Sequence, residues 1–113
     1  MTEPALTEGV YYILLSLTEP LHGYGIMQKT EELSGGRVRL AAGTLYGALA
    51  NMVERGWIES VPDEEGTPPP RGREARRHAY RITKRGRDVL RGEIVRLGEL
   101  YENGLRILEK EEL

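Results

Sequence analysis

The chain of 113 residues contains no cysteine, which excludes disulfide bridges and thiolate metal sites. It also lacks any run of about 18 apolar residues, so no membrane-spanning helix is expected. The start of the chain, residues 1–4, lacks the positive charge of a secretory signal. With 39% hydrophobic and 30% charged residues, the composition predicts one globular domain in the cytoplasm, stabilised by packing alone.

Histidine is scarce, since the chain has only His22 and His78. We interpret His22 as a structural cap at a helix start, and His78 as a surface residue or a phosphate contact. Two histidines without metal-ligand spacing make a poor zinc site. No glycine-rich phosphate loop ends in Gly-Lys-Ser/Thr, and no Ser–His–acid set can be assembled. The sequence therefore predicts a protein that is not an enzyme and carries no metal or other cofactor.

The net charge of the chain is −2, but the charged residues are unevenly distributed along it. Residues 1–70 hold 4 Lys or Arg against 10 Asp or Glu, and residues 92–113 hold 3 against 6. Residues 71–91, in contrast, hold 9 Lys or Arg against 2 Asp or Glu. A basic segment in an acidic chain suits a polyanionic partner. The alternative is a solvated basic surface loop.

Hydrophobic periodicity predicts four helices and three short strands. The expected helices cover residues 4–18, 22–34, 42–55 and 84–109, the last one capped by Thr83. The expected strands cover residues 37–41, 57–61 and 79–82, the last two forming a hairpin with a long proline-bearing loop. We therefore expect a mainly α protein with a small β-hairpin: a winged helix-turn-helix domain at residues 1–83 and a long C-terminal dimerisation helix at 84–113.

The third expected helix has a face suited to the major groove of DNA, where base edges can be distinguished. A helix-turn-helix reads bases with the N-terminal part of its second helix. The candidate DNA-binding residues on this helix are small or polar: Thr44, Tyr46, Gly47, Ala48 and Asn51. Asn51 matches adenine, whereas Gly47 and Ala48 let the backbone approach closely. The alternative is that these are merely exposed helix positions.

Arginines are frequent in the second half of the proline-bearing loop and continue into the second hairpin strand. Arginine suits phosphates and narrow minor grooves. The candidate DNA-binding residues of this arm are Arg71, Arg73, Arg76, Arg77 and Arg81. The other arm carries the acidic stretch 63–65, so we place the phosphate contacts on the arginine arm.

The final helix carries apolar residues at the alternating three- and four-residue steps of a coiled-coil seam. This stripe contains Leu90, Ile94, Leu97, Tyr101 and Leu108. A large exposed apolar surface is unfavourable in water, and a second copy of the chain would cover it. We therefore predict a homodimer through these residues; the alternative is packing against the chain's own domain.

Four segments together resemble the PadR family of bacterial transcriptional regulators. They are residues 22–26 (HGYGI), 43–49 (GTLYGAL), 54–58 (ERGWI) and 80–86 (YRITKRG), in family order. The resemblance implies a winged-helix dimer that represses by binding double-stranded DNA at an inverted repeat near a promoter. It also implies that the third helix enters the major groove and that the wing follows the backbone or minor groove.

The short chain resembles the subfamily with a single C-terminal helix. Some short members bind flat aromatic drugs between the two final helices, beside a tryptophan, which implies a small-molecule effector at the dimer interface. In this chain Tyr101 is the aromatic residue of that region, and Trp57 is expected in the core. The wing loop is also longer than is usual in the family. The rival interpretation is a winged-helix protein-interaction module that does not bind DNA.

Overall fold

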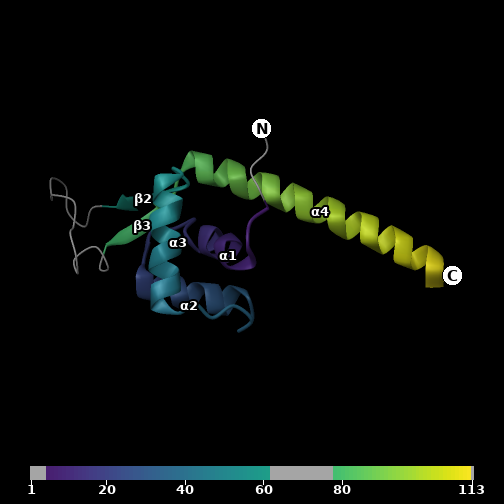
Figure 1. Cartoon of the computed structure of the whole chain (residues 1–113), viewed down its shortest axis with the longest axis horizontal. Coiled ribbons are helices and arrows are strands. Elements are labelled where there is room, and N and C mark those ends of the chain that lie inside the picture. The colour runs from purple at the N-terminus through teal and green to yellow at the C-terminus, as the bar shows by residue number, and fades with distance from the viewer. Residues whose placement is uncertain (1–4, 62–77, 113) are drawn as a thin grey trace.

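The computed structural model describes residues 5–61 and 78–112, and within them three helices and a small sheet form one body (Figure 1). The elements follow in the order α1 (Glu8–Ser16), β1 (Leu21–His22), α2 (Gly23–Leu33), α3 (Ala42–Glu54), β2 (Ile58–Val61), β3 (Ala79–Ile82) and α4 (Lys84–Glu112). The sheet is antiparallel with the order β1-β3-β2. Helix α4 leaves the body as a long extension (Figure 1). This is the expected winged helix with a long C-terminal helix.

The core lies where the apolar faces of the helices meet the sheet. On α3, Leu45, Leu49 and Met52 are buried, as the three- and four-residue spacing of one helix face predicts. Trp57 is also in the core cluster, which confirms its expected place. The other members come from α1 and the turn after it, α2, β2, β3 and the start of α4: Ile13, Leu14, Leu17, Ile26, Ile58, Ile82 and Leu90.

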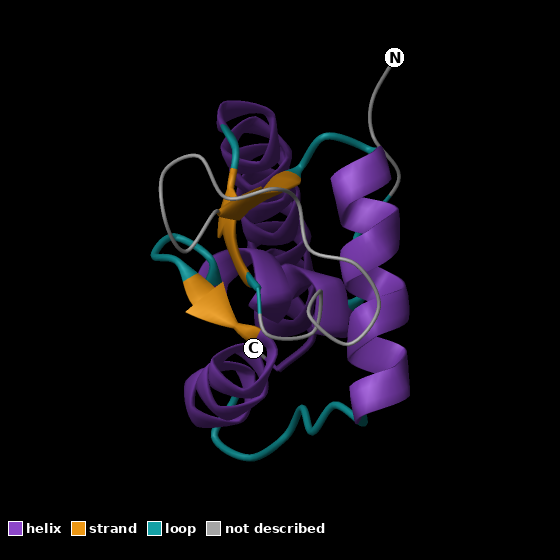
Figure 2. Ribbon diagram, turned by 90° about the vertical axis from the view of Figure 1, so that its left-hand side faces the viewer, coloured by secondary structure: helices purple, strands orange, loops and turns teal. Residues whose placement is uncertain are grey.

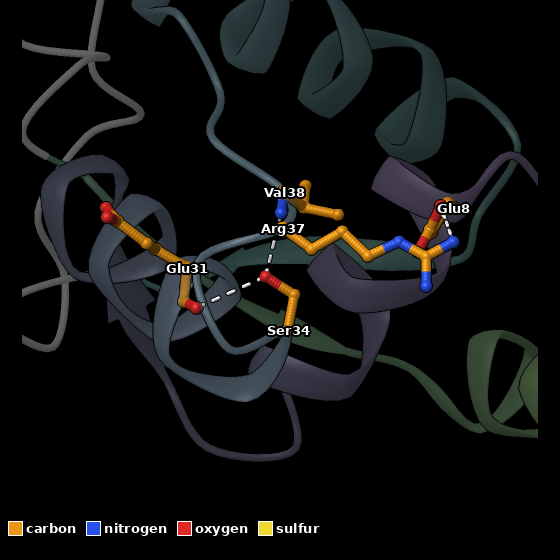
Figure 3. A network of polar contacts seen from close by, with 5 residues as sticks. All are labelled: Glu8, Glu31, Ser34, Arg37 and Val38. Carbon is orange, nitrogen blue, oxygen red and sulfur yellow. Dashed lines mark hydrogen bonds and ion pairs between the residues drawn. The ribbon is translucent and has the colours of Figure 1, made fainter.

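The strand expected at residues 37–41 is absent from the described structure, and a loop between α2 and α3 takes its place. In this loop, Val38 and Arg37 bond to the side chains of Ser34 and Glu8 (Figure 3). The Val38 N–H donates to the Ser34 hydroxyl at 2.9 Å, and the Arg37 guanidinium pairs with Glu8 at 3.0 Å. The third strand is instead β1, whose two residues pair with β3 in the register Leu21↔Tyr80.

The two histidines differ from their expected roles. His22 occupies the N-cap position of α2, but its side chain makes no capping hydrogen bond. His78 is only 6% exposed, so the prediction of a surface or phosphate-contacting residue is wrong. It directly precedes β3, at the point where the chain enters the centre of the sheet.

Helix α4 begins at a tight junction with the body. The Gly86 N–H donates to the Thr83 hydroxyl at 3.0 Å, which confirms the predicted cap, and that hydroxyl donates to the Gly56 carbonyl at 2.6 Å. A Cβ added to Gly86 would overlap the Trp57 carbonyl oxygen. Only glycine therefore lets α4 approach the end of α3 this closely.

Gly86→Ala is expected to lower the free energy of unfolding by about 1–3 kcal/mol, because the new methyl group forces the junction apart. The matched control is Gly92→Ala on the same helix, where an added Cβ meets nothing within 4 Å. That change should raise the free energy of unfolding by up to about 1 kcal/mol through helix propensity. Urea unfolding of both variants measures the difference. Equal stabilities would contradict the close contact at Gly86.

Candidate nucleic-acid interface

Helix α3 presents a slim, open face on the side opposite its buried residues. Gly43, Thr44, Gly47 and Asn51 are all exposed. A Cβ added to Gly43 or Gly47 would have nothing within 4 Å. Figure 2 shows α3 as the upright helix at the right-hand edge of the body, joined below to the loop from α2 and above to the sheet. A large binding partner can therefore approach the backbone of α3 closely on this face.

The N-terminus of α3 has no side-chain cap. Ala41 occupies the N-cap position and makes no side-chain capping hydrogen bond, and its methyl group has no acceptor to offer. The N–H groups of the first turn of a helix have no partner inside the helix. Together with the helix dipole, they form a site with affinity for anions such as phosphate oxygens.

Two of the predicted DNA-binding residues lie at the edge of this face rather than on it. Tyr46 is half-buried against the core. Its hydroxyl lies over Gly23 at the start of α2, where an added Cβ would overlap it. The pKa of the neighbouring Tyr80 is raised above its ordinary value, mainly because Tyr80 is partly buried and to a lesser extent because Tyr46 lies nearby. Ala48 is half-buried too, so both residues help to set the position of α3 on the body.

Asn51 is exposed, but its side chain is already oriented by a neighbour. Its Oδ1 accepts a hydrogen bond from Arg55 Nε at 2.8 Å, and the Arg55 guanidinium lies over the Trp57 ring, 5.1 Å from its centroid. An asparagine amide has, in addition, a second lone pair on Oδ1 that can accept a hydrogen bond and two N–H groups that can donate. Asn51 is thus held ready to present both an acceptor and a donor.

The structure places only part of the predicted arginine arm. Arg71, Arg73, Arg76 and Arg77 lie outside the described residues. Arg81 on β3 pairs with Glu59 on β2 at 2.7 Å, and both side chains are about half exposed. The described cation Arg85 lies close to Gly56, which is at the opposite end of α3 from Thr44.

The predicted dimer stripe on α4 is largely exposed, but Leu90 is not part of that exposed surface. Leu90 is 6% exposed and packs in the core of its own chain, because α4 still lies against the body at that point. Its assignment to the dimer interface is therefore corrected. The exposed members are Ile94, Leu97, Tyr101 and Leu108, accompanied by Leu100 and Leu105.

The family model described as "Transcriptional regulator PadR-like family" matches residues 12–92, more than half of the chain. The chain belongs to this family. A PadR family transcriptional regulator from Eggerthella lenta DSM 2243 is similar in structure, with a TM-score of 0.66 and 28% identity over 88% of this chain and 80% of that chain.

Two further solved structures share the fold. A PadR-like transcriptional regulator from Bacillus cereus strain ATCC 14579 has a TM-score of 0.63 and 22% identity over 89% of each chain. The Bacillus subtilis PadR, solved in complex with operator DNA, has a TM-score of 0.57 and 20% identity over 77% of this chain and 46% of that chain. No curated protein matches this chain.

The described part of the PadR-like chain offers few other kinds of site. No helix in it is both long and apolar enough to cross a membrane. Among residues 5–61 and 78–112, no three His, Asp or Glu side chains gather as a metal site would require.

Sequence reasoning missed one polar residue of this PadR-like protein, Glu93 on α4. Its side chain is only 7% exposed and accepts hydrogen bonds from the Leu6 backbone N–H and from Arg96. The Arg96 hydrogen bond, supported by the one from Leu6 and opposed by burial, holds the pKa of Glu93 below its ordinary value. The signal was available, because a carboxylate between Leu90 and Leu97 interrupts the apolar face of the helix.

Proposed function

We propose that this PadR-family regulator is a sequence-specific DNA-binding repressor in the cytoplasm, which binds an inverted-repeat operator as a homodimer and catalyses no reaction. The observation that carries the proposal is the open, slim N-terminal half of α3. An exposed helix of this width fits the major groove. The Bacillus subtilis PadR of the same fold was solved in complex with operator DNA, which supports DNA binding by this chain.

Each part of α3 has a distinct role in the proposed complex. The uncapped first turn at residues 42–44 binds a phosphate through backbone N–H groups. Gly47 allows the helix to sit deep in the groove because no side chain separates its backbone from the bases. Asn51 pairs with adenine through its amide, and Thr44 contacts a phosphate oxygen or a base. Tyr46 and Ala48 line the edge of the contact.

The homodimer forms through the exposed apolar side chains of α4, Ile94, Leu97, Tyr101 and Leu108. Two-fold symmetry presents two copies of α3 to two half-sites about 34–36 Å apart. A cavity of about 310 Å³ between α1 and α4 is lined by Tyr11, Tyr12 and Leu97, among others. A small-molecule effector at the interface would lie beside Leu97 in this cavity.

The arginines of the wing, Arg71, Arg73, Arg76, Arg77 and Arg81, bind phosphates in this proposal. For Arg81 such binding competes with Glu59. A mobility shift of duplex DNA should therefore weaken steeply with salt, by about 0.9 log units of affinity per log unit of salt for each phosphate that the protein neutralises.

Arg76→Ala/Arg77→Ala should reduce this salt slope by about 0.9 for each phosphate that the variant no longer neutralises, because an arginine that binds a phosphate releases counterions. The matched control is Arg106→Ala on the distal part of α4, which should leave the slope unchanged. Mobility shifts over a salt series measure both variants. Absent or salt-insensitive binding by the unmodified chain would instead favour the protein-interaction module.

A further inference from the structure

Glu93 lies where α4 leaves the body. Before it, Gly86 and Leu90 are buried against the domain. After it, none of the described side chains from 94 to 110 is buried. Glu93 is thus the last buried residue along the described side chains of α4, at the boundary between the winged-helix body and the projecting half of the helix (Figure 1).

The Glu93 carboxylate joins the segment before α1 to helix α4. Its Oε2 accepts a hydrogen bond from the Leu6 N–H at 2.8 Å, across 87 residues of sequence. Arg96, one turn further along α4, donates from Nε to Oε1 at 2.5 Å and from Nη2 to Oε2 at 2.9 Å. Leu6 in turn packs against the core. We call Leu6, Glu93 and Arg96 the exit clamp.

Packing alone does not fix the direction of α4 beyond this clamp. The cavity of about 310 Å³ between α1 and α4 is lined by two clamp residues, Glu93 and Arg96, and by Tyr11, Tyr12 and Leu97. A helix that borders an open space can tilt without creating a clash on that side. The clamp is therefore a polar constraint on the exit angle of α4.

Small tilts at this point have large consequences further out. At about 1.5 Å per residue, the segment after Glu93 extends roughly 28 Å. A tilt of about 5° displaces its far end by roughly 2.5 Å on this length. Successive base pairs lie about 3.4 Å apart, and in the proposed dimer a change in this angle moves each winged-helix body, with its α3, relative to its partner.

We propose that Glu93 is a positioning residue that fixes the angle between the winged-helix body and α4, and thereby sets the operator half-site spacing that the dimer accepts. This inference rests on the proposed function for the operator, but the angle itself can be measured without DNA. Because the chain has no cysteine, labels can be introduced at chosen positions only.

The first experiment measures one distance inside the chain. Spin labels at Glu32→Cys on α2 and Glu102→Cys on α4, in dimers diluted with unlabelled chain, report the exit angle by pulsed electron resonance. Glu93→Ala should at least double the width of the distance distribution or shift its mean by roughly 1 Å or more. Glu93→Gln, which keeps an oxygen for the Leu6 N–H, should stay nearer the unmodified protein. Glu99→Ala, an exposed carboxylate on α4, is the control.

The second experiment measures spacing preference. Palindromic duplexes that differ by one base pair at the centre should be discriminated roughly tenfold by the unmodified chain, and only about twofold by Glu93→Ala, with the same half-site preference. Arg96→Gln is a second variant for the case in which Glu93→Ala does not fold. It removes the more exposed clamp partner, and we expect the same loss of discrimination.

Unchanged distances in folded Glu93→Ala and Arg96→Gln would overturn the inference. Altered distances with an unchanged spacing ratio would overturn the part that concerns the operator. If the unmodified chain binds no duplex, the proposed function fails, together with the operator part of the inference. The distance measurement still decides whether Glu93 positions α4.

Discussion

Gly47→Gln is expected to abolish specific DNA binding while the protein stays folded. An added Cβ at Gly47 meets nothing within 4 Å, so the chain itself tolerates a side chain there. In the major groove the same side chain would hold the helix away from the bases and break several hydrogen bonds at once. Because a bidentate base contact is worth about 1–3 kcal/mol, removing two of them lowers affinity by at least roughly thirtyfold.

The matched control is Gly92→Gln on α4, another exposed helical glycine with no neighbour within 4 Å of an added Cβ. Both substitutions should raise the free energy of unfolding by about 0.5 kcal/mol, because glutamine is the better helix former. Only the change at Gly47 should affect a fluorescence-anisotropy titration with operator DNA. Full affinity in folded Gly47→Gln would show that this face of α3 does not enter the groove.

Leu97→Glu is expected to convert the dimer into monomers and to remove DNA binding with it. Leu97 is 41% exposed in the single chain and belongs to the stripe proposed as the interface. A carboxylate placed in an apolar contact loses its hydration without gaining a partner. Since linking two half-site contacts raises affinity by about 10²–10⁴, a monomer should bind the operator at least a hundredfold more weakly.

Val95→Glu is the control for this change. Val95 is 61% exposed and lies about 200° around the helix from Leu97, because each residue turns the helix by about 100°. It should therefore leave the dimer intact. Light scattering at micromolar concentration compares the two variants with the unmodified chain. A dimeric Leu97→Glu, or a monomeric unmodified chain, would contradict the proposed interface.

The elements with strong local signals were predictable from the sequence. The spacing of Leu45, Leu49 and Met52 placed α3 within one residue of its observed ends, and Thr83 marked the start of α4 correctly. Strand β1 was missed because it has two residues and exists only through pairing with β3, far along the chain. The alternation at 37–41 carried a similar local signal, but no strand lies beside it in the described structure, and the Val38 N–H bonds to the Ser34 side chain instead.

The candidate site was predictable in outline but not in its limits. Periodicity grouped Leu90 with Leu97, but it does not reveal where along α4 the body ends and solvent begins. The direction of Tyr46 depends on Gly23, which lies on a different helix. Both features depend on how distant segments pack, which no local pattern in the chain encodes.

The projecting half of α4 gains little tertiary burial in its own chain, since its described side chains from 97 to 110 are all exposed. A helical segment of this length is marginal in water by itself, and Gly98 and Gly104 weaken it by about 1 kcal/mol each relative to alanine. We therefore expect helix formation and subunit association to be one coupled event. DNA binding would then require the chain to exceed a threshold concentration. Below that concentration, the projecting half of α4 would not be helical and the regulator could not bind its operator.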